Sequence, residues 1–147
     1  MVLSIILFIV GVLFLVLSGA SDAVRDKILF HYDNSIFSKL KKQQFFNPEI
    51  SWKNKYKSDL KTPRFFLSTK SFVFVTDAVH LSKWLRNRFT EVGFLSIGFA
   101  SGLLLPYGFI VALACLISVG VFGALSFSIS FEKFFSKVYQ LKKEENN

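Results

Sequence analysis

The sequence contains a single cysteine, Cys115, so an intrachain disulfide and a CxxC metal or redox motif are both excluded. The GxSxG, Walker, GxGxxG and HExxH motifs are absent as well. These absences remove the sequence signatures of common hydrolases, nucleotide-binding proteins and zinc proteases. Cys115 lies within an apolar stretch and is most simply a small packing residue.

Charged side chains are missing from two long stretches, Met1 to Ala20 and Val92 to Ser130. A helix needs roughly 20 apolar residues to cross a hydrocarbon layer about 30 Å thick. The first stretch therefore predicts one crossing, and the second predicts two crossings joined by a tight turn at Pro106-Tyr107-Gly108. We expect an all-α integral membrane protein with three transmembrane helices, an N-terminal helix (1–20) and a C-terminal helical hairpin (92–131).

A cleaved signal peptide is the alternative interpretation of residues 1–20. The small residues Ser18-Gly19-Ala20 suit a cleavage site, but the cationic segment that opens a signal peptide is missing. All 18 lysines and arginines lie between Ser21 and Thr90 or after Ser130. With a retained helix, or uncleaved signal anchor, the positive-inside rule places every one of them in the cytoplasm. We therefore expect the N-terminus outside and the C-terminus cytoplasmic, in a membrane such as the bacterial inner membrane.

Residues 21–91 predict a basic, partly helical loop on the cytoplasmic membrane surface. Asp33-Asn34-Ser35 is a helix-start signal, and the following helix should end near Asn47-Pro48. Residues 47–64 have no clear period and predict an irregular loop. From Ser68 on, polar residues recur every three or four positions, which predicts an amphipathic helix that lies in the interface or runs into the second crossing. Residues 132–147 predict an amphipathic stub and a polar tail.

Aromatic and basic residues alternate in the loop. The net charge is +8, and cations beside a membrane favour anionic lipid over nucleic acid, so no nucleic-acid partner is expected. The candidate residues for binding lipid or a partner protein are Trp52, Lys53, Lys55, Tyr56, Lys57, Lys83, Trp84, Arg86 and Arg88.

Two strings of the loop, NPEISWKNKY (47–56) and TDAVHLSKW (76–84), resemble stretches of small, uncharacterised integral membrane proteins of bacteria. The resemblance covers about half of the chain. It implies a shared fold in the loop region and no particular activity, and no functional residues are carried over from it.

Small residues in the hairpin form rows that suit close helix packing in lipid. Gly98 and Gly102 make a GxxxG pair, and Gly120 and Ala124 belong to a matching row in the last helix. These rows predict either packing within the hairpin or association of the protein into a homo-oligomer or with another membrane protein.

Two histidines, each near an aspartate, are the candidates for chemistry: His31 with Asp33, and His80 with Asp77. Asp77 and His80 share one helix face, and the simplest interpretation is that they hydrogen-bond to each other. If the pairs faced each other, they would form a catalytic or metal site at the membrane boundary, and His31 and His80 are also the possible ligands of a metal or a haem. We expect no cofactor.

The composition and patterning together favour a small accessory, structural or interaction subunit held in the membrane. Its basic aromatic loop would contact anionic lipid or a partner protein. The alternative is a membrane-surface enzyme or metal-binding protein that acts on a lipid headgroup through Asp77, His80, His31 and Asp33. A small immunity or stress protein is a third class.

Overall fold

The computed structural model describes residues 1–141, and these residues form helices and turns with no β-strand. Three helices are long: α1 (Val2–Phe30), α4 (Ala78–Gly102) and α5 (Phe109–Lys133). The short elements are η1 (Ile36–Lys39), α2 (Gln43–Phe46), α3 (Pro48–Ser51), η2 (Trp52–Lys55), η3 (Val73–Val75), η4 (Leu105–Tyr107) and the π-helical turn η5 (Phe134–Val138).

Three segments are long and apolar enough to cross a membrane: Val2–Phe30, Ala78–Tyr107 and Phe109–Val138. They are the N-terminal helix and the two arms of a C-terminal hairpin, so the predicted all-α membrane architecture is confirmed. The hairpin turns through η4, where Pro106 stops the helix, and Gly108 follows with a φ of +121°. Residues other than glycine rarely adopt a φ angle in this range, so the turn depends on glycine at position 108.

The chain divides into two compact units. The membrane unit consists of Met1–Ala20 and Leu85–Phe131, and the basic unit consists of Ser21–Trp84 and the residues from Glu132 on. The long helices run through the boundaries between the units. In particular, α1 does not end at Ala20, as expected from hydropathy, but continues through a charged segment to Phe30.

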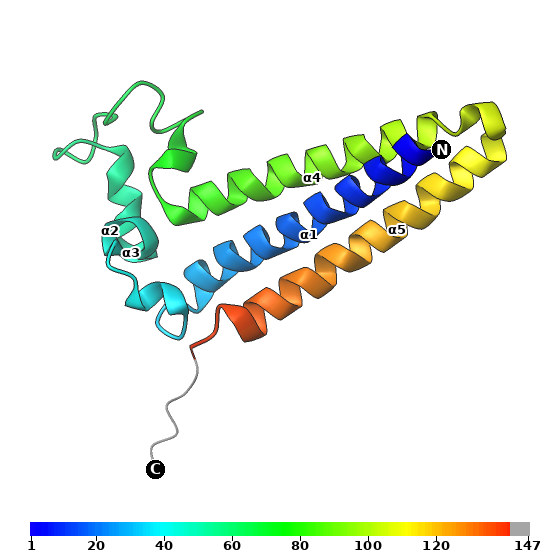
Figure 1. The fold of residues 1–147 in the computed structure, drawn as a ribbon. Helices are drawn as coiled ribbons and strands as arrows, with labels where there is room; N and C mark the ends of the chain where they lie inside the picture. Colours follow the sequence, from blue (N-terminus) through cyan, green and yellow to red (C-terminus); the bar gives the residue numbers. More distant parts are fainter. Residues whose placement is uncertain (142–147) are drawn as a thin grey trace, which may run out of the picture. The chain divides into compact units, whose positions relative to one another are not determined.

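Within the membrane unit, α1 lies between α4 and α5 (Figure 1). Glycines make these contacts close. A Cβ atom on Gly19 would lie 2.4 Å from the carbonyl oxygen of Phe127, and one on Gly93 would lie 2.9 Å from the Leu15 side chain. Gly123 also faces Leu15. The backbones therefore approach to distances that no larger residue at these positions allows.

The glycines expected to pack the hairpin lie elsewhere. A Cβ atom on Gly98, Gly102 or Gly120 would meet nothing within 4 Å among the described residues, and Ala124 is exposed. This differs from the packing expected from the sequence because both arms pack against α1, and the α4 face turned to it carries Gly93 and Ile97. Association of the protein with another chain through the Gly98 row stays a prediction.

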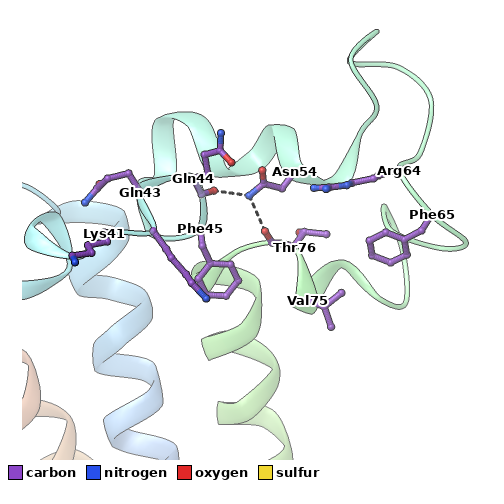
Figure 2. A pocket seen from close by; sticks show the side chains of 10 residues that line it. Lys41, Gln43, Gln44, Phe45, Asn54, Arg64, Phe65, Val75 and Thr76 are labelled. Carbon is purple, nitrogen blue, oxygen red and sulfur yellow. Dashed lines mark hydrogen bonds between the residues drawn. The ribbon is translucent and has the colours of Figure 1, made fainter.

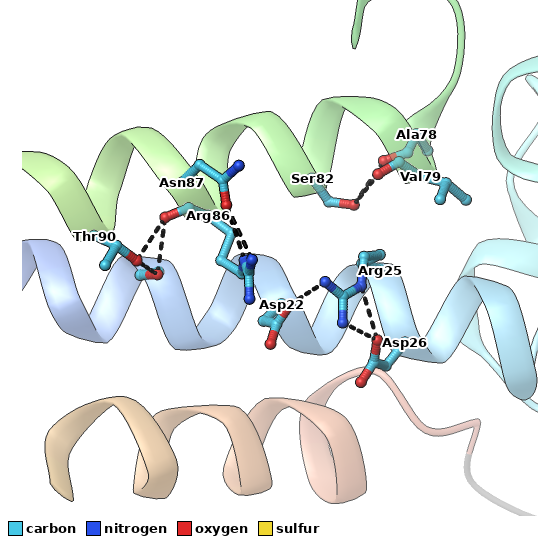
Figure 3. A network of polar contacts seen from close by, with 10 residues as sticks. Asp22, Arg25, Asp26, Ala78, Val79, Ser82, Arg86, Asn87 and Thr90 are labelled. Atoms are coloured by element: carbon cyan, nitrogen blue, oxygen red, sulfur yellow. Dashed lines mark hydrogen bonds and ion pairs between the residues drawn. The ribbon is translucent and has the colours of Figure 1, made fainter. Parts of the chain in front are cut away.

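Hydroxyl groups add hydrogen bonds between the helices of the membrane unit. The Ser18 hydroxyl lies 2.7 Å from that of Thr90 and donates to the carbonyl of Arg86 at 3.0 Å. The Thr90 hydroxyl also donates to the Arg86 carbonyl, as Figure 3 shows. On the other side of α1, the Ser130 hydroxyl donates to the carbonyl of Val16 at 2.8 Å. In lipid, which offers no competing water, such bonds hold helices at a fixed register.

The basic unit has its own small core. Ile28 of α1, Phe37 of η1 and Ala78 of α4 are buried together. Phe37 packs between the rings of Phe46 and Tyr139, with ring centroids 5.8 and 5.2 Å away. The partly buried side chains around this core are Val24, Tyr32, Ile36, Phe45, Phe46, Val79 and Tyr139. Aromatic packing thus joins the end of α1, the loop and the residues after α5.

The loop helices are shorter than the sequence indicates. The residues after Asp33 form only the turn η1 and the four-residue α2. The Asn47 side chain then accepts a hydrogen bond from the Glu49 amide at 2.9 Å and starts α3 inside the segment expected to be irregular. The helix expected from Ser68 begins at Ala78, so it is the first part of α4. The expected stub after α5 is the short turn η5, and its tail at 142–147 lies outside the described residues.

We predict that Gly19→Ala destabilises the protein and that Gly98→Ala does not. The added methyl group at Gly19 collides with the backbone of α5, and overpacking of this kind costs about 1–3 kcal/mol. At Gly98 it meets open space, and alanine is the better helix former by about 1 kcal/mol. Thermal unfolding of the purified variants in one detergent measures the difference, and a lower melting temperature for Gly98→Ala than for Gly19→Ala would contradict the packing described.

Candidate functional site

The Asp77–His80 pair stands at the start of α4. Asp77 is 1% exposed and directly precedes the helix. One of its carboxylate oxygens accepts the backbone N–H of His80 at 2.8 Å, and the His80 ring Nδ1 lies 2.8 and 2.9 Å from the two oxygens. The Thr76 hydroxyl donates to the same carboxylate at 3.1 Å. Asp77 therefore caps the helix, and His80 reinforces the cap.

The ionisation of Asp77 follows from these contacts. Burial by itself raises the pKa of the Asp77 carboxyl, but the hydrogen bonds from His80 and Thr76 outweigh it, and the net pKa is lowered. The carboxylate is therefore charged at neutral pH, where it also interacts favourably with the N-terminal end of the α4 dipole.

The second predicted pair does not join the first in a metal site. His31 is exposed and packs edge-on against Phe135, with ring centroids 5.3 Å apart. Between Met1 and Leu141, no group of three or more His, Cys, Asp or Glu side chains is placed to hold a metal ion. The interpretation in which His31, Asp33, Asp77 and His80 share one metal therefore finds no geometric support.

The alternating aromatic and basic residues form a continuous surface, here called the aromatic–cation surface, made of Trp52, Lys53, Lys55 and Tyr56. The Trp52 and Tyr56 rings meet nearly edge-on with centroids 6.4 Å apart. The ammonium of Lys53 lies 5.8 Å from the Trp52 ring centroid, and that of Lys55 lies 5.4 Å from the Tyr56 ring. Each cation is thus held beside an aromatic face, while Trp52 remains 42% exposed.

The chain reverses direction between Lys55 and Arg64. The amide of Lys57 donates to the Thr62 carbonyl at 2.8 Å, and that of Arg64 donates to the Lys55 carbonyl at 2.9 Å. Asp59 shapes the turn: hydrogen bonds from the Thr62 hydroxyl and the Lys61 and Thr62 amides lower its pKa to about 2. The reversal keeps Lys57 exposed at the base of the loop.

Exposed phenylalanines next to this loop were not among the predicted site residues. Phe66 is 79% exposed, Phe72 is 45% exposed, and the cations Arg64 and Lys70 flank Phe66 in sequence. Consecutive aromatic residues between two cations, without a helical period that would bury them, are the signal that predicts such exposure.

The remaining predicted residues have separate surroundings. Trp84 stacks on Phe74, with ring centroids 4.7 Å apart, and adjacent Lys83 is exposed. In the membrane unit, Arg86 donates to the Asn87 side chain at 3.0 and 3.2 Å, and Arg88 pairs with Glu91 at 2.7 Å. Trp84 and Trp52 thus each pack against a neighbouring ring and remain 39% and 42% exposed.

The basic unit also contains a pocket of about 580 Å³. Figure 2 shows its lining, with Asn54 at the centre and Arg64 pointing toward it. The Asn54 amide donates to the carbonyls of Gln44 and Thr76, the latter at 3.0 Å, and so joins three loop segments. The pocket is lined by Lys41, Lys42, Gln43, Gln44, Phe45, Asn54, Arg64, Phe65, Val75 and Thr76.

The chain matches no protein-family model, and no curated protein and no solved structure matches it. The resemblance of residues 47–56 and 76–84 to small bacterial membrane proteins therefore stays a prediction. The features that bear on function are therefore the aromatic–cation surface and the pocket of the basic unit.

We predict that Asp77→Ala exposes the first turn of α4 to exchange, because loss of an N-cap costs about 1–2 kcal/mol. His80→Ala should have a smaller effect, since the backbone N–H of residue 80 can still donate to Asp77. Because the folded-state pKa of Asp77 is lowered, its contribution is complete at neutral pH and is lost as the pH falls through that pKa. Hydrogen exchange of the amides of residues 78–82 measures this, and equal protection in wild type and Asp77→Ala would contradict the cap.

Proposed function

We propose that this protein is a small membrane-embedded interaction subunit whose basic unit lies against the anionic lipid surface of its own membrane. The observation that carries the proposal is the aromatic–cation surface, in which the exposed Trp52 ring, the partly exposed Tyr56 ring and two lysine ammonium groups occur side by side. Amphipathic aromatic rings favour the headgroup region of a bilayer, and cations favour anionic headgroups.

The exposed phenylalanines support a lipid partner over a purely aqueous one. Phe66 and Phe72 would each remove apolar area from water on entering the interface, at roughly 25 cal/mol per Å². The neighbouring cations Lys61 and Lys70 add about 1 kcal/mol each when they lie near anionic lipid. Rings that insert and cations that stay at the surface are the pattern of an interfacial segment.

The membrane unit supports this orientation of the chain. Its contacts run α1 antiparallel to α4 and parallel to α5: Ser18 lies against Arg86, and Gly19 lies against Phe127. The chain therefore leaves this unit at Ala20, Leu85 and Phe131, all at one end, while the other end holds the uncharged turn at Pro106. We propose that the end with the cations is cytoplasmic and that the N-terminus is outside.

An enzymatic role for Asp77 and His80 has no separate support, because their hydrogen bonds are those of a helix cap. The lipid-binding proposal leaves room for a membrane-protein partner on the open faces of the hairpin, and co-purification from mild detergent identifies it.

We predict that Trp52 contacts lipid. Trp84→Phe leaves Trp52 as the only tryptophan, and its emission should be quenched by lipids brominated near the headgroup. Quenching should be stronger in nanodiscs that contain anionic lipid than in zwitterionic ones, because the lysines add electrostatic attraction.

Charge reversal tests the role of the cations. In the same background, Lys53→Glu with Lys55→Glu and Lys57→Glu should reduce the quenching, whereas the three corresponding Lys→Arg changes should preserve it. Quenching that is equal in the Glu and Arg variants, or absent in wild type, would refute contact of this surface with anionic lipid. A partner protein that protects Trp52 in the absence of lipid would replace the proposal.

We predict that Ser58 is cytoplasmic. Because the sequence contains a single cysteine, labelling can report on one chosen position. Cys115→Ala removes the native thiol, and Ser58→Cys adds one in the exposed turn. A membrane-impermeant maleimide should label Ser58→Cys only after cells are opened, whereas Tyr107→Cys at the opposite turn should be labelled in intact cells. The reverse pattern would invert the topology.

A further inference from the structure

The pocket of the basic unit shares no residue with the aromatic–cation surface and is lined by a separate group of cations. Lys41, Lys42 and Arg64 line it, and none of its lining residues is acidic. Its volume, about 580 Å³, lies within the usual range for small-molecule sites, roughly 300–1,000 Å³. Its composition therefore favours an anionic ligand.

The three cations of the pocket have no counter-charge in the described chain. Within Met1–Leu141, the side chains of Lys41, Lys42 and Arg64 form no ion pair and no hydrogen bond, unlike Arg25, which pairs with Asp22 at 2.9 Å. Like charges gathered without a partner repel one another, and a bound anion relieves that repulsion.

The frame of the pocket is held by hydrogen bonds that involve none of these cationic side chains. Asn54 ties the backbones at Gln44 and Thr76, and the Ser68 hydroxyl donates to the Lys55 carbonyl at 2.7 Å. The Arg64 backbone amide is fixed to the same carbonyl. Such a frame reduces the ordering cost of ligand binding, because the walls are in place beforehand.

The distribution of charge along the pocket limits the ligand further. In Figure 2, Lys41 and Arg64 lie at opposite ends of the row of side chains, with Gln44 and Asn54 between them. A singly charged anion would satisfy one end only. A guanidinium pairs with two phosphate oxygens at once, and an ammonium acts as a point charge for phosphate. Phe45, Phe65 and Val75 provide apolar walls for an organic group attached to the phosphate.

We propose that this pocket binds a phosphate ester or pyrophosphate group that carries two or more negative charges. The phosphate belongs either to a lipid headgroup or to a soluble compound, and the proposal depends on the lipid-surface function above only in the first case. The ligand would bridge the cations of the two ends, with its organic part against the apolar walls.

Val75 offers a matched pair of variants for the test. It lies in the pocket wall and is 52% exposed, so a longer polar side chain can be accommodated without repacking. Val75→Glu places a negative charge in the pocket, and Val75→Gln adds the same shape without the charge. The combined variant Lys41→Gln, Lys42→Gln and Arg64→Gln removes the cations themselves.

The full chain, in nanodiscs of zwitterionic lipid, is titrated with inorganic pyrophosphate by calorimetry. Wild type and Val75→Gln should bind one pyrophosphate each. Val75→Glu and the triple Gln variant should bind at least about tenfold more weakly, because the first repels the anion and the second loses the charge-assisted hydrogen bonds. No binding to wild type, or equal affinity for Val75→Glu and Val75→Gln, would overturn the proposal.

Two further experiments distinguish a lipid headgroup from a soluble phosphate compound, and the pocket proposal from the lipid-surface function. Phosphatidic acid added to the nanodiscs should lower the apparent affinity for pyrophosphate if a lipid headgroup uses the pocket, and unchanged affinity assigns the pocket to a soluble compound. The triple Lys→Glu variant of Lys53, Lys55 and Lys57 should keep pyrophosphate binding within about threefold, since these residues lie outside the pocket and act on it only at long range. If Trp52 shows no contact with lipid while the protein still binds pyrophosphate, only the lipid-surface function is refuted.

Discussion

The close approach of α1 to its two neighbours is the constraint on which the membrane unit depends. Apolar helices in lipid gain little by leaving one apolar environment for another, so their association relies on van der Waals contact and a few hydrogen bonds. The glycines of the three helices permit that contact, and the Ser18 and Ser130 hydroxyls fix its register. Both arms of the hairpin pack against α1, and the row at Gly98 and Gly102 meets nothing within 4 Å among the described residues.

Cations play two different roles in the basic unit. Lys53 and Lys55 lie beside aromatic rings, an arrangement that suits a broad contact with anionic headgroups. Lys41, Lys42 and Arg64 surround a cavity and have no partner of their own among the described residues, an arrangement that suits one discrete ligand. Under the two proposals, the same basic composition would provide a surface for lipid contact and a separate pocket for one ligand.

Hydropathy and charge were sufficient to predict the class of the protein, because the uncharged apolar stretches match the roughly 20 residues that a helical crossing needs. The turn at Pro106 and Gly108 followed from the backbone limits of those two residues, and the i, i+3 spacing of Asp77 and His80 indicated their hydrogen bond. Periodicity also marked the face of α4 before the crossing, though not where the helix begins, since Asp77 rather than Ser68 supplies the cap.

The packing glycines and the pocket were not predictable in the same way. A GxxxG pattern shows that a helix face carries small residues, but not which helix packs against it. Gly93 makes the close contact because α1 lies on that side of α4. The pocket brings together residues from 41 to 76 through the bonds of Asn54 and through the chain reversal at Asp59. Such bonds between segments have no local pattern that a sequence displays.

The central place of α1 has a consequence for how the chain is made. Of the three long helices, α1 precedes the hairpin in the chain and packs against both of its arms. Until the hairpin is translated, both of these faces of α1 lie against lipid. Assembly of the membrane unit is therefore completed only when the last helix arrives and the Ser130 hydroxyl reaches the Val16 carbonyl. A chain that is truncated within α5 would therefore contain α1 without the complete helix that packs against it at Gly19 and Val16.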